Sequence, residues 1–120
     1  MTTIAENTDL ATFINVFTVE PSNQQELVDL LVDATETHVR RIPGFVSAAL
    51  HRSVDGTRVT MYAQWQSLAH YQDYQSTLSD PGQAPYVEKV LAIARFEPAR
   101  QEVVKVFAAA ATPSQAERSS

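Results

Sequence analysis

Asn15, Trp65 and Tyr71 are the residues whose types and spacing point to a ligand site. Asn15 places a carboxamide in an apolar run, and a buried amide without partners costs about 1 to 3 kcal/mol. Trp65 offers a flat apolar wall, and Tyr71 offers a phenol that donates a hydrogen bond. These side chains could line one cavity that binds a ligand. The simpler alternative is that Asn15 bonds local backbone and Trp65 is the largest core residue.

Several other kinds of chemistry lack the residues they need. The sequence has no cysteine, which excludes disulfides, thiolate nucleophiles, zinc–thiolate sites and iron–sulfur clusters. The 3 glycines stand alone, so no glycine-rich phosphate loop can form. His38, His51 and His70 have no metal-ligand spacing. We therefore expect no tightly bound nucleotide cofactor and no metal site.

The composition of the chain indicates where the protein is located and which partners it can bind. The chain has 120 residues, 44% hydrophobic and 19% charged, with a formal net charge of −5. The basic residues are scattered, which argues against a nucleic-acid partner. No apolar run is long enough to cross a membrane and no signal peptide is visible, so we expect a cytoplasmic protein. One domain this small leaves apolar surface for a partner subunit.

The order of elements predicts the fold class. Apolar alternation predicts a strand over Ala11–Glu20, and Ser22 with Gln25 predicts a capping box opening a helix to about Arg41. Asp-Gly between alternating runs predicts a hairpin. The remaining expected elements are strands over Phe45–Ser53 and Arg58–Trp65, helices over Leu68–Leu78 (capped by Ser67) and Ala84–Ala94, and a strand over Arg100–Phe107.

This order predicts an α+β fold of the ferredoxin-like βαββαβ type with an antiparallel sheet, whose first and third strands are neighbours. We expect a lead over residues 1–10, one domain over residues 11–108 and a tail over residues 109–120. The apolar residues expected on the sheet face away from the helices need cover, which predicts a homodimer of the α/β barrel type. They are Ile14, Val16, Val46 and Leu50.

Strand parity gathers the candidate site residues on the helix side of this sheet. Alternation places Phe13, Asn15 and Phe17 on the face that also carries Met61, Ala63 and Trp65. On the following helix, Tyr71 and Tyr74 lie three positions apart and share a face, while His70 points to a neighbouring one. The predicted pocket thus has Asn15, Trp65 and Tyr71 as its working residues, surrounded by Phe13, Phe17, Met61, Ala63, Tyr74 and His70.

Three local stretches resemble the antibiotic biosynthesis monooxygenase family, small dimeric ferredoxin-like proteins that include cofactor-independent oxygenases of aromatic polyketide pathways. The turn Pro43-Gly44-Phe45 follows the first helix, and the hairpin reads His51-Arg52-Ser53-Val54-Asp55-Gly56-Thr57-Arg58. The third strand ends Tyr62-Ala63-Gln64-Trp65 before Ser67 and Tyr71. The similarity covers about residues 13–107 and is greatest to the anthrone oxygenases.

The resemblance implies a reaction and a site. An anthrone-type polyketide would be oxidised by O2 to a quinone without flavin or metal. The family site uses an asparagine on the first strand, an asparagine on the third strand, the tryptophan and a tyrosine on the next helix. Asn15, Trp65 and Tyr71 match, whereas Met61 stands at the third-strand asparagine position. Either Asn15 and Tyr71 orient the substrate alone, or the pocket performs different chemistry.

Three alternatives stay open at this point. The first is a cofactor-free polyketide cyclase or isomerase on the same fold, which Met61 slightly favours. The second is a heme-degrading relative with a histidine on the following helix, although His70 lies close behind Trp65 for that role. The third is a non-catalytic dimeric binding module, in which Trp65 would be packed on all sides instead of bordering a cavity.

Overall fold

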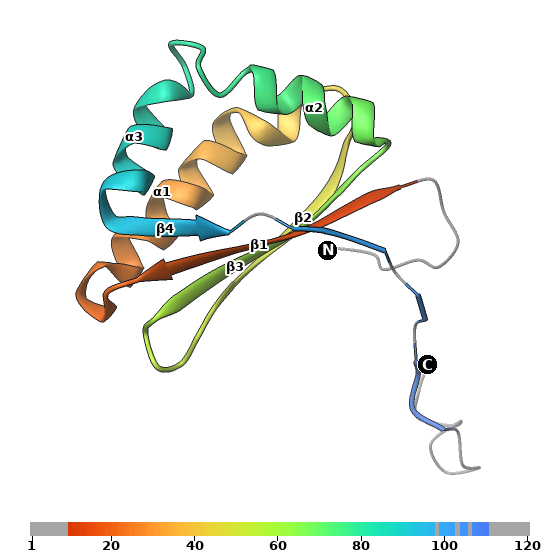
Figure 1. Ribbon diagram of the computed structural model, residues 1–120, viewed down its shortest axis with the longest axis horizontal. Helices are drawn as coiled ribbons and strands as arrows, with labels where there is room; N and C mark the ends of the chain where they lie inside the picture. Colours follow the sequence, from red (N-terminus) through yellow and green to blue (C-terminus); the bar gives the residue numbers. More distant parts are fainter. Residues whose placement is uncertain (1–9, 98, 103, 106, 111–120) are drawn as a thin grey trace.

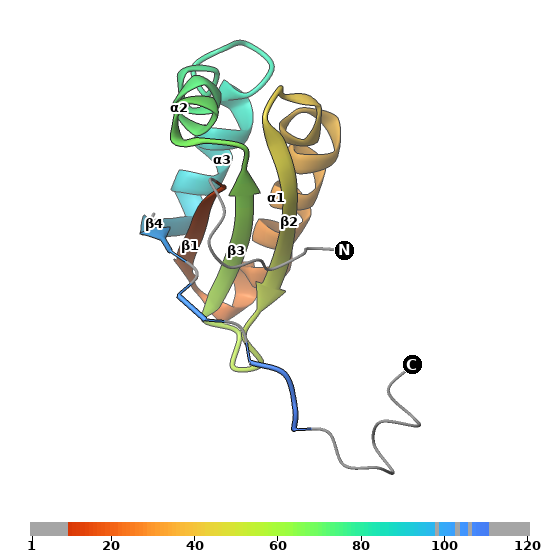
Figure 2. The ribbon, with the colours of Figure 1, turned by 90° about the vertical axis from the view of Figure 1, so that its right-hand side faces the viewer.

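The computed structural model describes residues 10–97, 99–102, 104–105 and 107–110. Within these residues, one antiparallel sheet carries three α-helices on one of its faces (Figure 1). Figure 2 shows the helices layered against β1, β2 and β3 from the side. The order and layering confirm the ferredoxin-like α+β fold, although the predicted lead and tail lie almost wholly outside the described residues.

The element bounds follow the chain. The strands are β1 (Ala11–Val19), β2 (Phe45–Arg52), β3 (Arg58–Trp65), β4 (Ala94–Glu97) and β5 (Arg100–Gln101). The α-helices are α1 (Gln24–Thr37), α2 (Leu68–Ser76) and α3 (Ala84–Ile93). Short 3-10 turns flank α1, η1 (Pro21–Asn23) before it and η2 (Val39–Arg41) after it.

The first and third strands are central neighbours, as predicted. The sheet order is β2-β3-β1-β4, and β5 also pairs with β1. Phe13 pairs with Ala63, Asn15 with Met61, and Phe17 with Val59. The β1–β3 register contains no bulge, so the parity argument that placed these side chains on one face is confirmed.

A bulge in β2 overturns one prediction about the other face. Phe45 pairs with Trp65, but Ser47 pairs with the adjacent Gln64, so one extra residue interrupts the ladder. One extra residue reverses the parity of everything after it. Leu50 therefore pairs with Met61 and packs toward the helices, and its predicted place on the outer face was wrong.

The first helix begins and ends inside its predicted range. The N-cap of α1 is Asn23, which makes no side-chain capping bond, so the predicted Ser22–Gln25 capping box is wrong. Gln25 instead donates to Asp29 and accepts from Arg52. At the other end α1 stops at Thr37, and the turn η2 (Val39–Arg41) follows before Pro43.

The junction before β2 depends on Gly44. Gly44 has φ +92°, and a Cβ added there would lie 2.3 Å from ring atoms of His70. Its carbonyl accepts from the backbone N–H of Gln66 at 2.7 Å. A residue with a side chain would be strained and would collide with α2, so the Pro-Gly-Phe turn fixes how α2 sits on the sheet.

The last strand starts earlier than predicted. The sequence favoured pairing over Arg100–Phe107, whereas the structure forms β4 directly after α3 and, among the described residues beyond it, the short β5. Val19 pairs with Ala94 and Phe17 with Phe96, because α3 delivers the chain to the edge of β1. The rings of Phe17 and Phe96 stack with centroids 4.8 Å apart. This early start brings Phe96 to the cavity described below.

Two buried clusters hold the helices on the sheet. One is made of Phe17, Val19, Leu27, Val59, Val90 and Ala94. The other is made of Ala11, Phe13, Trp65 and Tyr71, at the opposite end of β1 and β3. Across the described part of the chain, no helix is long and apolar enough to span a membrane.

Candidate active site

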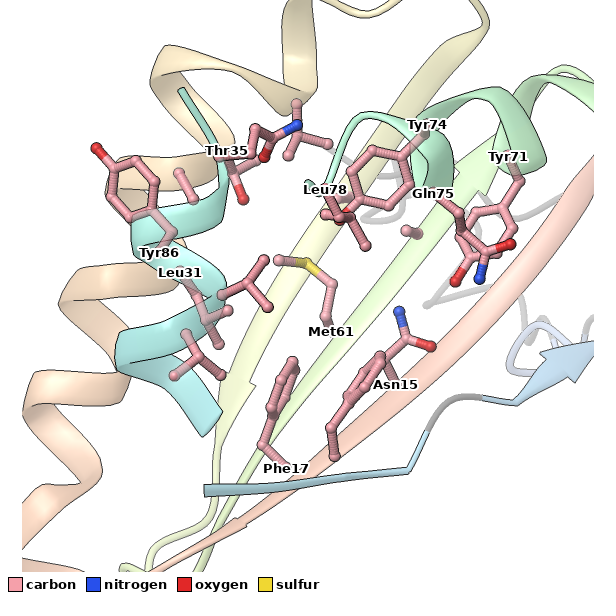
Figure 3. A pocket seen from close by; sticks show the side chains of 18 of the residues that line it. Asn15, Phe17, Leu31, Thr35, Met61, Tyr71, Tyr74, Gln75, Leu78 and Tyr86 are labelled. Carbon is pink, nitrogen blue, oxygen red and sulfur yellow. The ribbon is translucent and has the colours of Figure 1, made fainter. Parts of the chain in front are cut away.

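A cavity of about 210 Å³ lies between the sheet and its helices. Its floor comes from β1 and β3, and its other walls come from β2, β4 and the three helices (Figure 3). Asn15, Trp65 and Tyr71 are all among the residues that line it. The polar side chains of its lining are Asn15, Thr35, Tyr71, Tyr74, Gln75, Gln83 and Tyr86.

Asn15 is the polar group of the cavity floor. β1 presents it between Phe13 and Phe17, directly opposite Met61. Its Oδ1 atom is buried and has no hydrogen-bond partner among the described residues. An unpaired buried carbonyl oxygen costs about 1 to 3 kcal/mol. The floor thus holds an amide whose N–H2 can donate to a ligand oxygen and whose Oδ1 has no partner among the described residues.

Aromatic rings form one wall of the cavity. Trp65 is 1% exposed at the end of β3. Its ring stacks on Tyr74 at 5.0 Å and meets the ring of Phe45 edge-on at 5.3 Å. Tyr71 stacks on Phe13 at 3.6 Å and approaches Trp65 at 6.0 Å. Rings held on several sides keep one orientation, so the wall is rigid and suited to a planar ligand.

The two phenols of α2 stay protonated at neutral pH. Burial, reinforced by the neighbouring Tyr71, raises the pKa of Tyr74 to about 12. Burial also raises the pKa of Tyr71, against the opposing effect of a hydrogen bond from Gln75. A phenol with a raised pKa is a hydrogen-bond donor, not a base. These residues can therefore stabilise negative charge on a ligand oxygen.

Two of the predicted site residues do not line the cavity. Phe13 lies behind Tyr71 and supports it by stacking. His70 is turned away, because its Nδ1 lies 2.7 Å from the Oγ of Ser67 and its ring packs against Gly44. Ser67 caps α2 by accepting from the backbone N–H of His70, as the sequence predicted. His70 thus secures the start of α2, and the structure gives no support to the heme-degrading alternative.

The other predicted residues lie together. Phe17, Met61, Ala63 and Tyr74 all line the cavity with the three principal residues. Sequence reasoning missed Gln75 and Gln83, the second of which is buried and donates to Thr77 at 3.0 Å. Gln75 stands one helical turn after Tyr71, a spacing that could have signalled the pair. The lining also contains apolar residues of α1 and α3 that were not predicted as site residues, such as Leu31, Val87, Val90 and Leu91.

Metal chemistry has no evident support in the geometry. Among the described residues, no group of three or more His, Asp or Glu side chains is placed to hold a metal ion. The cavity lining contains no carboxylate and no imidazole. What this lining can do is bind, orient and stabilise an oxygen anion. A largely apolar cavity with a few polar groups is the usual form of a small-molecule site.

Comparison with known proteins identifies the family. The antibiotic biosynthesis monooxygenase profile matches residues 11–89. The tetracenomycin-F1 monooxygenase of Streptomyces glaucescens is 43% identical over 109 residues, which cover 91% of this chain and 95% of that protein. The chain therefore belongs to the antibiotic biosynthesis monooxygenase family and is a monooxygenase.

Solved structures agree with the fold. The monooxygenase ActVA-Orf6 of Streptomyces coelicolor, determined with nanaomycin D, is 27% identical with a TM-score of 0.70, covering 86% of this chain and 94% of its own. SnoaB, a cofactor-independent oxygenase from Streptomyces nogalater, matches with a TM-score of 0.67 at 24% identity, covering 82% and 97% of the two chains. At that identity, SnoaB supports the shared fold alone.

Proposed function

We propose that this monooxygenase oxidises a polycyclic phenolic, anthrone-type polyketide intermediate to a quinone with O2 and without a cofactor. The observation that carries the proposal is the unpartnered Oδ1 of Asn15 in an aromatic-walled cavity. A hydroxyl beside a ketone on a planar ring system presents one donor and one acceptor. The Asn15 amide presents the complementary acceptor and donor.

The comparisons support the substrate class. One relative is named for tetracenomycin F1, and ActVA-Orf6 was solved with nanaomycin D. The polar groups of the present cavity lining are neutral amides, hydroxyls and phenols, set among aromatic and aliphatic side chains. A reaction driven by the substrate's own electrons requires only binding, orientation and charge stabilisation from such a lining.

The proposed reaction balances without an added reductant. The substrate gives the proton of its activated ring carbon to solvent as it ionises, and the resulting carbanion transfers one electron to O2. Recombination of the radical pair forms a carbon–oxygen bond to a peroxide. Loss of water then leaves the quinone, so one oxygen atom enters the product and the other enters water. Both reducing electron pairs come from the substrate.

Each residue has a defined part in this scheme. Asn15 holds the hydroxyl and ketone oxygens and stabilises the enolate that forms, and the protonated Tyr71 donates to the same region. Gln75 bonds to Tyr71 and fixes the direction of its phenol. Trp65 holds the ring plane against the wall. The apolar remainder of the lining excludes water, which strengthens these interactions.

The pH dependence should follow the substrate and not the protein. The lining has no group that titrates near neutrality, and the phenols of Tyr71 and Tyr74 have raised pKa values. We expect kcat/KM to rise with pH along the ionisation of the substrate. Two substrates of different acidity, assayed between about pH 6 and 9.5, should show inflections displaced by their pKa difference. A single inflection common to both would assign the titration to the protein and contradict this scheme.

Isotope labelling tests the reaction. A hydroxylated anthrone and tetracenomycin F1 would each be incubated with the protein under 18O2, and the quinone analysed by mass spectrometry. The proposal expects one labelled oxygen atom in the quinone and one in water. Unlabelled quinone, or label entering at the rate of the protein-free reaction, would reject it.

A cyclase or isomerase is the second candidate, favoured by Met61. A thioether cannot donate a hydrogen bond to a substrate carbonyl or peroxide. Asn15 pairs with Met61 across β1 and β3, so an amide there would have stood directly beside the Asn15 amide. Conversion of a polyketide under strict anaerobiosis, with a product of unchanged mass, would support this candidate against the oxygenase.

We further propose that two chains pair through the outer sheet face. Ser47, Tyr62 and Gln64 lie on that face, and each has a buried side-chain oxygen without a hydrogen-bond partner among the described residues. Val104 and Phe107, each 85% exposed, lie on a segment that extends away from the sheet (Figure 1). A second chain would bury the exposed apolar side chains, whereas the three polar oxygens are already enclosed within one chain.

Sedimentation equilibrium tests the pairing. We expect the mass of two chains, with Phe107→Asp weakening association at least about tenfold, the loss of one large buried side chain. Val54→Asp is the matched control, because Val54 is fully exposed in the hairpin loop. A single-chain mass at every concentration would refute the pairing.

A further inference from the structure

A second hollow lies directly beside the main cavity. It has a volume of about 150 Å³ and lies along the edge between α1 and β2. Val32 and Glu36 are exposed at its border, so it opens toward solvent. Four residues line both hollows and so make up their common wall, namely Leu31, Thr35, Ala48 and Met61.

Met61 is the large side chain that the sheet contributes to this common wall. Ala48, its sheet neighbour in the wall, contributes only a methyl group, and Leu31 and Thr35 come from α1. Across the strands Met61 pairs with Asn15 on one side and with Leu50 on the other. Figure 3 shows Met61 between Asn15 and Leu31. Beyond Met61, the floor that begins at Asn15 continues into the second hollow.

We propose that Met61 is a specificity-determining residue, which limits how far a planar ligand anchored at Asn15 extends toward the α1–β2 edge. The inference rests on the proposed function, since it takes a polycyclic phenol as the ligand. Methionine is unbranched and flexible, so it closes the gap without a rigid fit. A shorter side chain would join the two hollows and admit one more fused ring, which would pack on Leu31 and Leu50.

This assignment gives the departure at Met61 a role. An asparagine at this position would add a second polar contact beside Asn15. Methionine makes no such contact, and its apolar side chain instead limits the length of ligand that the cavity accepts. The hydroxyl of Thr35 is the polar group of the shared wall and would face a substituent on the outermost ring. The predicted substrate class is therefore a planar phenol whose far ring is apolar or carries a single hydroxyl.

Fluorescence of the single tryptophan gives a readout that does not need turnover. Trp65 is the sole tryptophan and borders the main cavity, so a bound quinone should quench it. The probes are 1,8-dihydroxyanthraquinone, with three rings, and 6,11-dihydroxy-5,12-naphthacenequinone, with four rings in a line. Met61→Ala should shift the affinity ratio toward the four-ring probe by at least about tenfold, the gain expected from burying one more ring.

Control variants separate this effect from a general loss of core packing. Leu30→Ala removes a core side chain of α1 that lines neither hollow, and it should leave the affinity ratio unchanged. Met61→Val, a milder shortening, should shift the ratio in the same direction if Met61→Ala does not fold. An unchanged ratio in the folded Met61 variants, or no quenching by either probe, would overturn the inference. A shifted ratio without oxygen consumption would keep it and reject the oxygenase instead.

Discussion

Replacing Asn15 by alanine is expected to lower kcat/KM by about a hundredfold, as the loss of one preorganised anion-stabilising group typically does. The free energy of unfolding should stay the same or rise. The Oδ1 of Asn15 is buried without a partner, so the folded protein bears a desolvation cost that the substitution removes. Steady-state kinetics and a thermal melt on the same sample measure the two effects.

Asn15→Leu sharpens this test, because leucine has the same number and branching of side-chain heavy atoms as asparagine and neither polar atom. It should lose as much activity as Asn15→Ala and melt at a higher temperature. Lower activity together with a higher melting temperature would show that Asn15 serves the reaction and lowers the stability of the fold. Unchanged kinetics, or losses of activity and stability that run in parallel, would instead assign Asn15 a structural part.

Replacing Trp65 by phenylalanine is the second large effect, with turnover falling well over tenfold. The indole ring is held by Tyr74 on its face and by Phe45 at its edge, and it borders the cavity. A smaller ring leaves room for the substrate to tilt, and a displacement of about 1 Å at the reacting atoms can cost a factor of about 100. The unfolding free energy should fall by about 1 to 3 kcal/mol.

Leu27→Val is the matched control for Trp65→Phe. Leu27 is fully buried in the other core cluster and does not line the cavity, so its truncation should lower stability while kcat stays near the original value. Equal losses of turnover in the two variants would trace the effect to stability. Unchanged kinetics in Trp65→Phe would remove the indole from the mechanism.

The alternation of side chains along β1 and β3 was enough to predict much of the candidate site from the sequence. The chain pairs β1 with β3 without a bulge, so alternation alone places Asn15 beside Met61 on the helix side. Ser67 as the cap of α2 likewise followed from local chemistry. These predictions succeeded because they depend on contacts near in sequence or on an uninterrupted ladder.

Other features depend on tertiary contacts that no local pattern records. The extra residue between Phe45 and Ser47 reverses the parity of β2, and nothing in its alternation signals the bulge. The early start of β4 depends on where α3 meets β1. His70 is directed away from the cavity by Ser67 and Gly44, which the three-residue spacing of Tyr71 and Tyr74 does not reveal.

Oxygen uptake measures the central claim most directly. Chelator-treated protein would be mixed with 1,8-dihydroxyanthrone in an oxygen electrode cell, with quinone absorbance followed in parallel and the protein-free reaction subtracted. The account predicts uptake in proportion to protein, one oxygen molecule for each quinone formed, and a large decrease for Asn15→Ala. Binding of the anthrone, seen as quenching of Trp65, without oxygen uptake above the protein-free rate would contradict it.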